Sequence, residues 1–355
     1  MNPVRISPQK AFEEASKFQQ KLAAGMKTLR ELDEVGYGAT DKEEVYREDK
    51  MVVYRFKGAR RPTAKVPILI VYALVNRPYM VDLQSDRSMV GNLLAQGEDV
   101  YLIDWGYPSK ADRYLSIDDY VNGYINNCVD VIRKKNKTDK VNIISVCQGG
   151  TLSLIYTSLH QNKIRNLVTQ VTPVDFSTND GLLFRWSKDM DFDKIVEGYN
   201  GLIPGSFLNE GFEQLKPMMK LQKQQSMINV LDDKDKLQNF LRMEKWIADS
   251  PAQAGECFRQ FMKDLYQKNL LVKDELVVGG KKVKLKNITC PVLNIFATED
   301  HLVPPAATKH LVDFIGSKDK ETISFKGGHI GVFVGSKSQK ELAPAVAEFL
   351  KKRDK

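Results

Sequence analysis

Apolar residues recur along this chain in two patterns, one typical of buried strands and one typical of helices. Short apolar runs predict strands at residues 51–56, 66–71, 99–103, 141–146 and 167–171. The alternation resumes at Val292, with an apolar strand in the stretch from Asn294 that ends at Asp300 and another strand at 322–325. Between most of these runs lie segments with helical spacing of apolar residues, such as the helix that starts at Ser116 with a capping box to Asp119. Strands that alternate with helices predict a mostly parallel sheet.

The alternation stops between about residues 177 and 284, where the pattern is helical and loop-like and rich in methionine and aromatic residues. We therefore divide the chain into a first core part at 1–176, an inserted cap at 177–284, and a second core part at 285–355. The aromatic residues of the insertion are expected to form the core of the cap itself. Alternatively, the cap gates a path to a site beneath it.

The N-terminal residues 8–33 predict one amphipathic helix of about seven turns. Its apolar positions recur at intervals of three and four: Ala15, Phe18, Leu22, Met26, Leu29 and Leu32. We expect this face to pack on the core, and the alternative is contact with a partner or with another surface.

A nucleophile elbow is predicted at Cys147, which follows the apolar run 141–146 and precedes a helix running toward His160. Ser145 and Gly149 flank the cysteine at the small positions of the G-x-S-x-G pattern, with Cys in place of the central Ser. Such a sharp turn admits only small neighbours and places the sulfur at a helix N-terminus, which stabilises a thiolate. Taken alone, the pattern also fits a buried cysteine on an ordinary turn.

Two later residues favour the catalytic interpretation. Asp300 follows an apolar strand, and His329 follows a strand and the glycine pair Gly327 and Gly328. The order nucleophile, acid, base, with the acid and base each after a strand, is that of α/β-hydrolases. We therefore predict an α/β-hydrolase fold with Cys147, Asp300 and His329 as catalytic residues.

Other residues are predicted to serve the same site. In this fold the oxyanion hole takes one N–H from the loop after an early strand and one from the residue after the nucleophile, here Val75 and Gln148. An ordinary loop at 74–79 is the alternative. Asn76 and His301 are candidate substrate-binding residues, and His301 could equally be a packing residue.

Composition and charge set limits on the function. The 355 residues are enough for one large α/β domain with an insertion, and the net charge of +8 is spread along the chain. We interpret it as weak attraction to anions such as CoA, with no nucleic-acid motif. The four cysteines and four histidines lack metal-ligand spacing, and no cofactor is predicted. Without an apolar signal segment, a cytoplasmic protein is expected.

The chain resembles the catalytic subunit of polyhydroxyalkanoate synthases of the two-component kind called class III, and the resemblance covers nearly the whole chain. It rests on SVCQGG at 145–150, VYALVNRPY at 71–79, LIDWG at 102–106, FLRMEKW at 240–246, AGE at 254–256, DHLVP at 300–304 and GGHIG at 327–331. Ser145 departs from the glycine that usually opens the class III box, and its small side chain predicts no loss of activity. The shorter class IV relatives are also similar.

The resemblance implies polymerisation of (R)-3-hydroxyacyl-CoA, mainly 3-hydroxybutyryl-CoA, with release of CoA and a chain carried as a Cys147 thioester. His329 would deprotonate the thiol. Asp300 would either orient His329 or activate the 3-hydroxyl of the incoming unit. A hydrolase with the same triad, such as a thioesterase, a dienelactone hydrolase or an intracellular depolymerase, is the second hypothesis, and a granule-coat protein is the third.

The resemblance also implies partners and a location. These are a homodimer, a second synthase subunit of the E-type (R-type if the chain is class IV), and attachment to polyhydroxyalkanoate granules in the cytoplasm.

Overall fold

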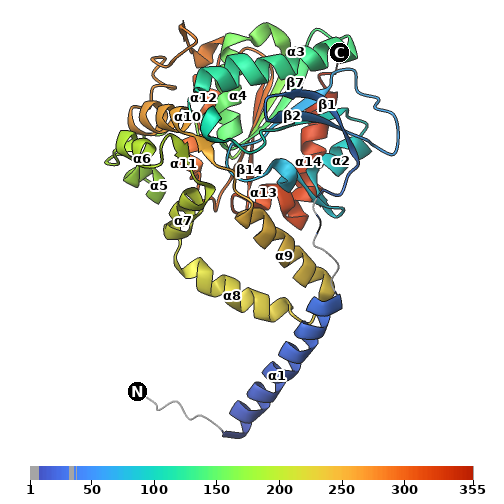
Figure 1. Cartoon of the computed structure of the whole chain (residues 1–355). Coiled ribbons are helices and arrows are strands. Elements are labelled where there is room, and N and C mark those ends of the chain that lie inside the picture. Colours follow the sequence, from blue (N-terminus) through green and yellow to red (C-terminus); the bar gives the residue numbers. More distant parts are fainter. Residues whose placement is uncertain (1–7, 32–35, 37, 355) are drawn as a thin grey trace.

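A central eight-stranded sheet organises the chain (Figure 1). The computed structural model describes residues 8–31, 36 and 38–354. The strand order is β1-β2-β6-β3-β7-β8-β13-β14. The β1–β2 and β2–β6 pairs are antiparallel, and every other pair in this sheet is parallel. The mostly parallel sheet predicted from the sequence is thereby confirmed.

The strands lie close to the predicted apolar runs. Their bounds are β1 (Lys42–Glu48), β2 (Met51–Phe56), β3 (Ile68–Val71), β6 (Val100–Asp104), β7 (Val141–Val146), β8 (Ile164–Gln170), β13 (Val292–Ala297) and β14 (Lys320–Phe325). The edge strand β1 was not predicted, because its sequence KEEVYRE is mostly charged. Charged side chains are common on edge strands, where they discourage pairing with other chains.

Helices cover both faces of the sheet, because alternate residues of its strands point to opposite sides. Leu69 and Val71 of β3 join one apolar cluster, whereas Ile68 and Ile70 join the other. The first cluster includes residues of α3 (Asn126–Asn136) and α4 (Gln148–Leu159); the second includes residues of α2 (Met89–Ala95), α13 (Gly331–Val334) and α14 (Ser336–Lys351). After β13 the chain forms two short helices, α11 (Pro305–Thr308) and α12 (Leu311–Phe314).

The segment between β8 and β13 is largely helical, as expected for a cap. Its helices are α5 (Leu182–Trp186), α6 (Phe192–Gly198), α7 (Gly205–Leu215), α8 (Met218–Val230), α9 (Lys234–Ala248) and α10 (Gly255–Gln260), which continues as the π-helical η5 (Phe261–Gln267). In Figure 1, α8 and α9 extend away from the body of the molecule. The cap limits of 177 and 284 stay a prediction.

The N-terminal helix α1 (Pro8–Glu31) meets the far corner of the cap, where α8 ends and α9 begins, and runs outward from that corner (Figure 1). Lys21 Nζ donates to the Asn229 carbonyl at 2.9 Å, and a Cβ on Gly25 would touch Leu231. Three apolar side chains of α1 are exposed, Phe12, Phe18 and Met26. The expectation that α1 packs on the core is therefore wrong, because the protruding α8–α9 corner holds the helix away from the sheet. Contact with a partner or surface stays a prediction.

Spanning a lipid bilayer would require an apolar helix of about 20 residues. No helix in the described part of the chain is long and apolar enough to do so.

The junction of β7 and α4 leaves no room for a side chain at Gly149. A Cβ there would lie 2.4 Å from the Tyr72 carbonyl oxygen and 2.5 Å from that of Val71, at the end of β3. Both contacts are with backbone, so no side-chain rotation could relieve them. The elbow therefore requires glycine at the second position after the cysteine.

Gly149→Ala should lower the free energy of unfolding by about 1–3 kcal/mol, the usual cost of overpacking a core. Urea denaturation measures this. The matched control is Gly211→Ala on α7, where a Cβ meets no atom within 4 Å; it should gain up to about 1 kcal/mol through helix propensity. Equal stability of Gly149→Ala and the unmodified chain would contradict the packing argument.

Candidate active site

Cys147 occupies a strained turn between β7 and α4. Its φ of 52° lies in the left-handed region, which is uncommon for a residue other than glycine and which clusters at functional sites. The Cys147 N–H donates to the Gln170 carbonyl at 2.9 Å, and its carbonyl accepts from Gly150 N–H at 2.8 Å. The backbone is thus fixed on both sides. Cys147 is half-buried, while the chain's three other cysteines are fully buried.

Ser145, the departure from the usual small residue, is accommodated inside the sheet. Its Oγ donates to the Val168 carbonyl on β8 at 3.0 Å, and its side chain is fully buried. The hydroxyl is therefore satisfied by the neighbouring strand, which agrees with the expectation that serine is tolerated here.

Asp300 and His329 meet because they follow two strands that pair in parallel, β13 and β14. His329 Nδ1 donates to Asp300 Oδ2 at 2.6 Å. The other carboxylate oxygen, Oδ1, accepts from the N–H groups of Leu302 and Val303, each at 2.9 Å. Both side chains are almost inaccessible to solvent. The carboxylate is therefore held by three hydrogen bonds in one orientation.

The charge on the imidazole is set by its two neighbours. Burial lowers the pKa of His329, but the interactions with Asp300 and Cys147 outweigh it and raise that pKa to about 10. Since Nδ1 faces Asp300, Nε2 is the ring nitrogen left for the sulfur. The structure thus brings the three predicted residues together in the order carboxylate, imidazole, sulfur.

The two predicted oxyanion-hole donors lie at adjoining backbone turns. Gln148 is the first residue of α4, and its side-chain Oε1 accepts from the Leu74 N–H at 3.2 Å. The next N–H of that loop belongs to Val75. Neither the Val75 nor the Gln148 N–H donates to another residue within the described ranges. Both groups are free to receive an oxyanion, and that role stays a prediction.

The two candidate substrate-binding residues differ in their surroundings. The Asn76 amide nitrogen donates to the Ser250 hydroxyl at 2.7 Å and to two carbonyls at the end of α9, so its donors are already engaged by the cap. His301 is half-buried and makes no hydrogen bond to the residues the structure describes. Burial lowers the pKa of His301, and the positive charges of Lys216 and His329 act in the same direction. Contact of either residue with substrate stays a prediction.

An aromatic cluster beside the triad was missed by sequence reasoning. Tyr266 of η5 lies with its ring centroid 4.7 Å from that of Phe176 and 4.9 Å from that of Phe184. Burial raises the pKa of the Tyr266 phenol above its usual range, and the charges of Cys147 and Asp300 add to the rise. Cys147 packs against the apolar cluster to which Tyr266 belongs. In the sequence these rings look like ordinary cap core, and nothing in their spacing links them to Asp300.

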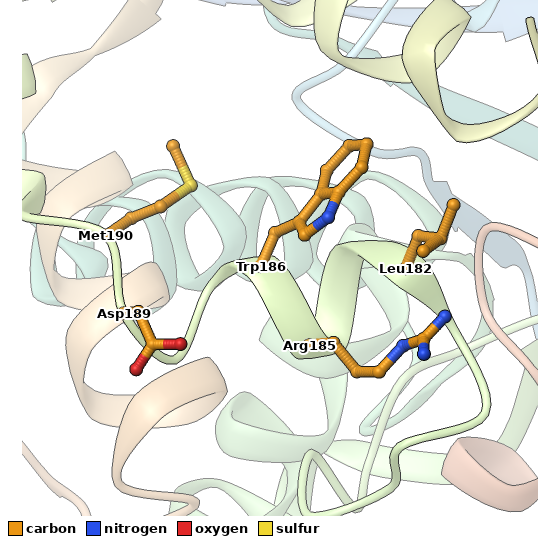
Figure 2. A pocket seen from close by; sticks show the side chains of 5 residues that line it. All are labelled: Leu182, Arg185, Trp186, Asp189 and Met190. Carbon is orange, nitrogen blue, oxygen red and sulfur yellow. The ribbon is translucent and has the colours of Figure 1, made fainter.

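A separate cavity of about 580 Å³ opens on the outer side of α5 (Figure 2). Its lining consists of Leu182, Arg185, Trp186, Asp189 and Met190, and none of them belongs to the triad. Among the described ranges, no group of three or more His, Cys, Asp or Glu side chains is placed to hold a metal ion.

Comparisons with known proteins agree with this geometry. The family described as the alpha/beta hydrolase fold matches residues 66–336, which is more than half of the chain. The curated "Poly(3-hydroxyalkanoate) polymerase subunit PhaC" of Allochromatium vinosum is 53% identical over 358 residues, covering 99% of this chain and 100% of that one. The protein of the same name from Synechocystis is 47% identical and covers 98% and 95%, respectively.

A monoacylglycerol lipase of Paleococcus ferrophilus has a solved structure similar to this one. Its TM-score is 0.56 at 17% sequence identity, with coverage of 85% of this chain and 99% of that one, which shows the fold alone. The predicted α/β-hydrolase fold is confirmed, and the names of the curated relatives do not favour the hydrolase hypothesis. This chain belongs to the PhaC family of poly(3-hydroxyalkanoate) polymerase subunits, on the alpha/beta hydrolase fold.

Proposed function

We propose that this protein polymerises (R)-3-hydroxyacyl-CoA, mainly 3-hydroxybutyryl-CoA, into polyhydroxyalkanoate and releases CoA. The observation that carries the proposal is the buried Asp300–His329 pair next to the sulfur of Cys147, in a chain 53% identical to a polymerase subunit over its full length. The hydrogen bond at Nδ1 directs Nε2 of the imidazole at the nucleophile, as general-base catalysis requires.

The first step transfers the acyl group to the enzyme. The Cys147 sulfur attacks the thioester carbonyl while its proton resides on His329, and the bond from the carbonyl carbon to the CoA sulfur breaks. CoA leaves with the proton from His329. During the attack the carbonyl oxygen becomes an oxyanion, which the N–H groups of Val75 and Gln148 would stabilise. One thioester replaces another, so the acyl group stays activated for the next transfer.

The second step extends the chain. The 3-hydroxyl of an incoming unit attacks the acyl group on Cys147, its proton passes to the His329–Asp300 pair, and the sulfur leaves. The lengthened chain then resides on the CoA thioester of the new unit. Cys147 attacks that thioester in turn and a second CoA is released. In this scheme Asp300 assists the deprotonation of the hydroxyl, the more demanding proton transfer, because an alcohol is far less acidic than a thiol of pKa about 8.5.

Exclusion of water supports transfer to a hydroxyl rather than hydrolysis. Phe176 and Phe184 are fully buried, Phe261 and Tyr266 are nearly so, and Cys147 packs against the apolar cluster to which these rings belong. An acyl-cysteine in such surroundings is protected from water, whereas a hydrolase must admit it.

The partners belong to the same proposal. The curated relatives are named subunits, which implies a second component of the synthase. For this chain we propose a homodimer that works with an E-type second subunit, on polyhydroxyalkanoate granules in the cytoplasm. An R-type subunit would take that place if the chain is class IV.

Cys147→Ala should abolish CoA release from 3-hydroxybutyryl-CoA, because no other cysteine reaches the triad. Release is followed with a thiol reagent, and polymer and free 3-hydroxybutyrate are quantified in the same samples. The matched control, Cys290→Ala, alters a cysteine buried elsewhere in the core and should keep most of the activity. Free acid in place of polymer from the unmodified protein would support the hydrolase hypothesis, and near-normal turnover by Cys147→Ala would contradict the role of the nucleophile.

Asp300→Asn should still acylate Cys147 and release a first CoA, then stall, because the hydroxyl of the next unit keeps its proton. A rapid-quench experiment with labelled substrate should show labelled acyl-enzyme with little polymer. If the folded variant forms no acyl-enzyme, Asp300 instead acts mainly by orienting His329.

The pKa of His329 predicts a pH dependence of stability. Folding raises the pKa of His329 from 6.5 to about 10. The protonated imidazole therefore stabilises the folded state fully below a pH of about 6.5, and this stabilisation is lost as the pH rises toward 10. The free energy of unfolding should therefore fall more between pH 7 and 10 in the unmodified protein than in Asp300→Asn. Nitrogen-15 NMR should show His329 protonated at pH 8 and His301, whose pKa burial lowers, neutral at that pH. A neutral His329 at pH 8 would refute this charge assignment.

A further inference from the structure

Asn76 joins the loop after β3 to the cap. It is one of the few non-glycine residues with a positive φ, 56°. Its amide nitrogen donates to the Trp246 and Ile247 carbonyls at 3.3 and 3.4 Å and to Ser250 Oγ at 2.7 Å. Carbonyls in the last turn of a helix lack partners within that helix, so Asn76 acts as a cap for the C-terminal end of α9.

The end of α9 holds the loop in return. The Trp246 indole Nε1 donates to the Arg77 carbonyl at 2.8 Å, and this side chain is only 5% exposed. The Tyr79 hydroxyl donates to Asp249 Oδ2 at 3.1 Å. Contacts run in both directions between residues 76–79 and one helix terminus, so this segment and the helix end form a single packed unit.

Val75 lies between two such anchors. On its N-terminal side the Leu74 N–H is held by the Gln148 side chain at 3.2 Å, and on its C-terminal side Asn76 is held by α9. The direction of the Val75 N–H follows from the backbone angles that these two anchors fix. An oxyanion-hole donor must lie within a few tenths of an ångström of its working position to be effective.

We propose that Asn76 is a positioning residue, which sets the Val75 N–H of the oxyanion hole by docking the loop on the C-terminal end of α9. The inference rests on the proposed function, since it assigns a cause to the geometry of that oxyanion hole. It also replaces the expectation that Asn76 contacts the substrate. Under this assignment the seating of the cap and the rate of acylation are coupled.

Asn209 provides a matched control from the cap side. From α7, its Nδ2 donates to the Ile247 carbonyl at 2.9 Å, and its Oδ1 accepts from Ser250 Oγ at 2.8 Å. Asn209 therefore contacts the same helix end as Asn76 but no residue of the loop 74–77. If Asn76 only stabilised the cap, its substitution should change the acylation rate as little as the substitution of Asn209 does.

The test is the acylation rate of Cys147, measured by rapid quench with labelled 3-hydroxybutyryl-CoA in the full-length protein. Asn76→Gly keeps the left-handed backbone accessible and removes the side chain with its amide. It should slow acylation at saturating substrate about tenfold or more, with the half-saturating concentration changed less than about threefold. Loss of a whole oxyanion-hole donor costs about 10²–10³-fold, and displacement of one should cost less. Asn209→Ala should stay within about threefold of the unmodified rate.

Asn76→Asp separates the effect of losing the amide donor from the effect of changing the backbone conformation. Aspartate also tolerates a positive φ but presents no donor to the two carbonyls, so it should be at least as slow as Asn76→Gly. Trp246→Phe loosens the same junction from the cap and should slow acylation too. It keeps the assignment testable if a change at position 76 prevents folding.

The outcomes are distinct. Acylation at the unmodified rate in Asn76→Gly or in Trp246→Phe, or equal slowing in Asn209→Ala, would overturn the positioning role while leaving the proposed function intact. Failure of the unmodified protein to form any acyl-enzyme would overturn the proposed function and this assignment together.

Discussion

The close approach between the end of β3 and the first turn of α4 is the constraint on which the site depends. The Val71 and Tyr72 carbonyls occupy the space that any side chain on Gly149 would need. This contact fixes the start of α4, and hence the place of Cys147 at its N-terminus. It also sends the chain that leaves β3 past α4, where Leu74 is held by Gln148. Cys147 and the loop proposed to supply the oxyanion hole are thus brought together by one packing requirement.

A buried pair of polar groups, Asp300 and His329, then sets the charge of the imidazole. Removing a carboxylate from water is costly unless its oxygens are paired, and both oxygens of Asp300 are. The fixed negative charge raises the pKa of His329 against the effect of burial. The raised pKa favours the protonated imidazole, so His329 can hold the proton that a cysteine thiol gives up when its sulfur attacks an acyl group.

The cap serves this chemistry in two ways. Its aromatic side chains belong to the apolar cluster against which Cys147 packs, while the end of α9 is packed onto the loop that carries Val75. A polymerase has reason to combine the two, because an acyl-enzyme must persist until the next hydroxyl arrives. The other end of α9 lies at the outer corner of the cap, where α1 meets the cap (Figure 1). One helix therefore runs from the loop that carries Val75 to the N-terminal helix.

The sequence by itself determined the sheet, the helical insertion and the elbow, because each leaves a local pattern: period-two or continuous apolar runs, helical spacing, and small residues around Cys147. The order of Cys147, Asp300 and His329 along the chain, with the last two each after a strand, was enough to predict that these residues meet. Among the strands of the central sheet, the sequence analysis missed the edge strand β1, because most of its residues are charged and no apolar run marks it.

Contacts between segments distant in the sequence were decided by the tertiary structure alone. The sequence placed Asn76 near the site but could not show that its amide is taken up by α9, about 170 residues away. The sequence pattern predicted that Tyr266 belongs to the core of the cap, and did not link it to the catalytic residues. The same kind of pattern predicted that α1 packs on the core, whereas α1 lies at the outer corner of the cap. An amphipathic pattern records that a face is apolar, whereas the partner of that face depends on how the whole chain packs.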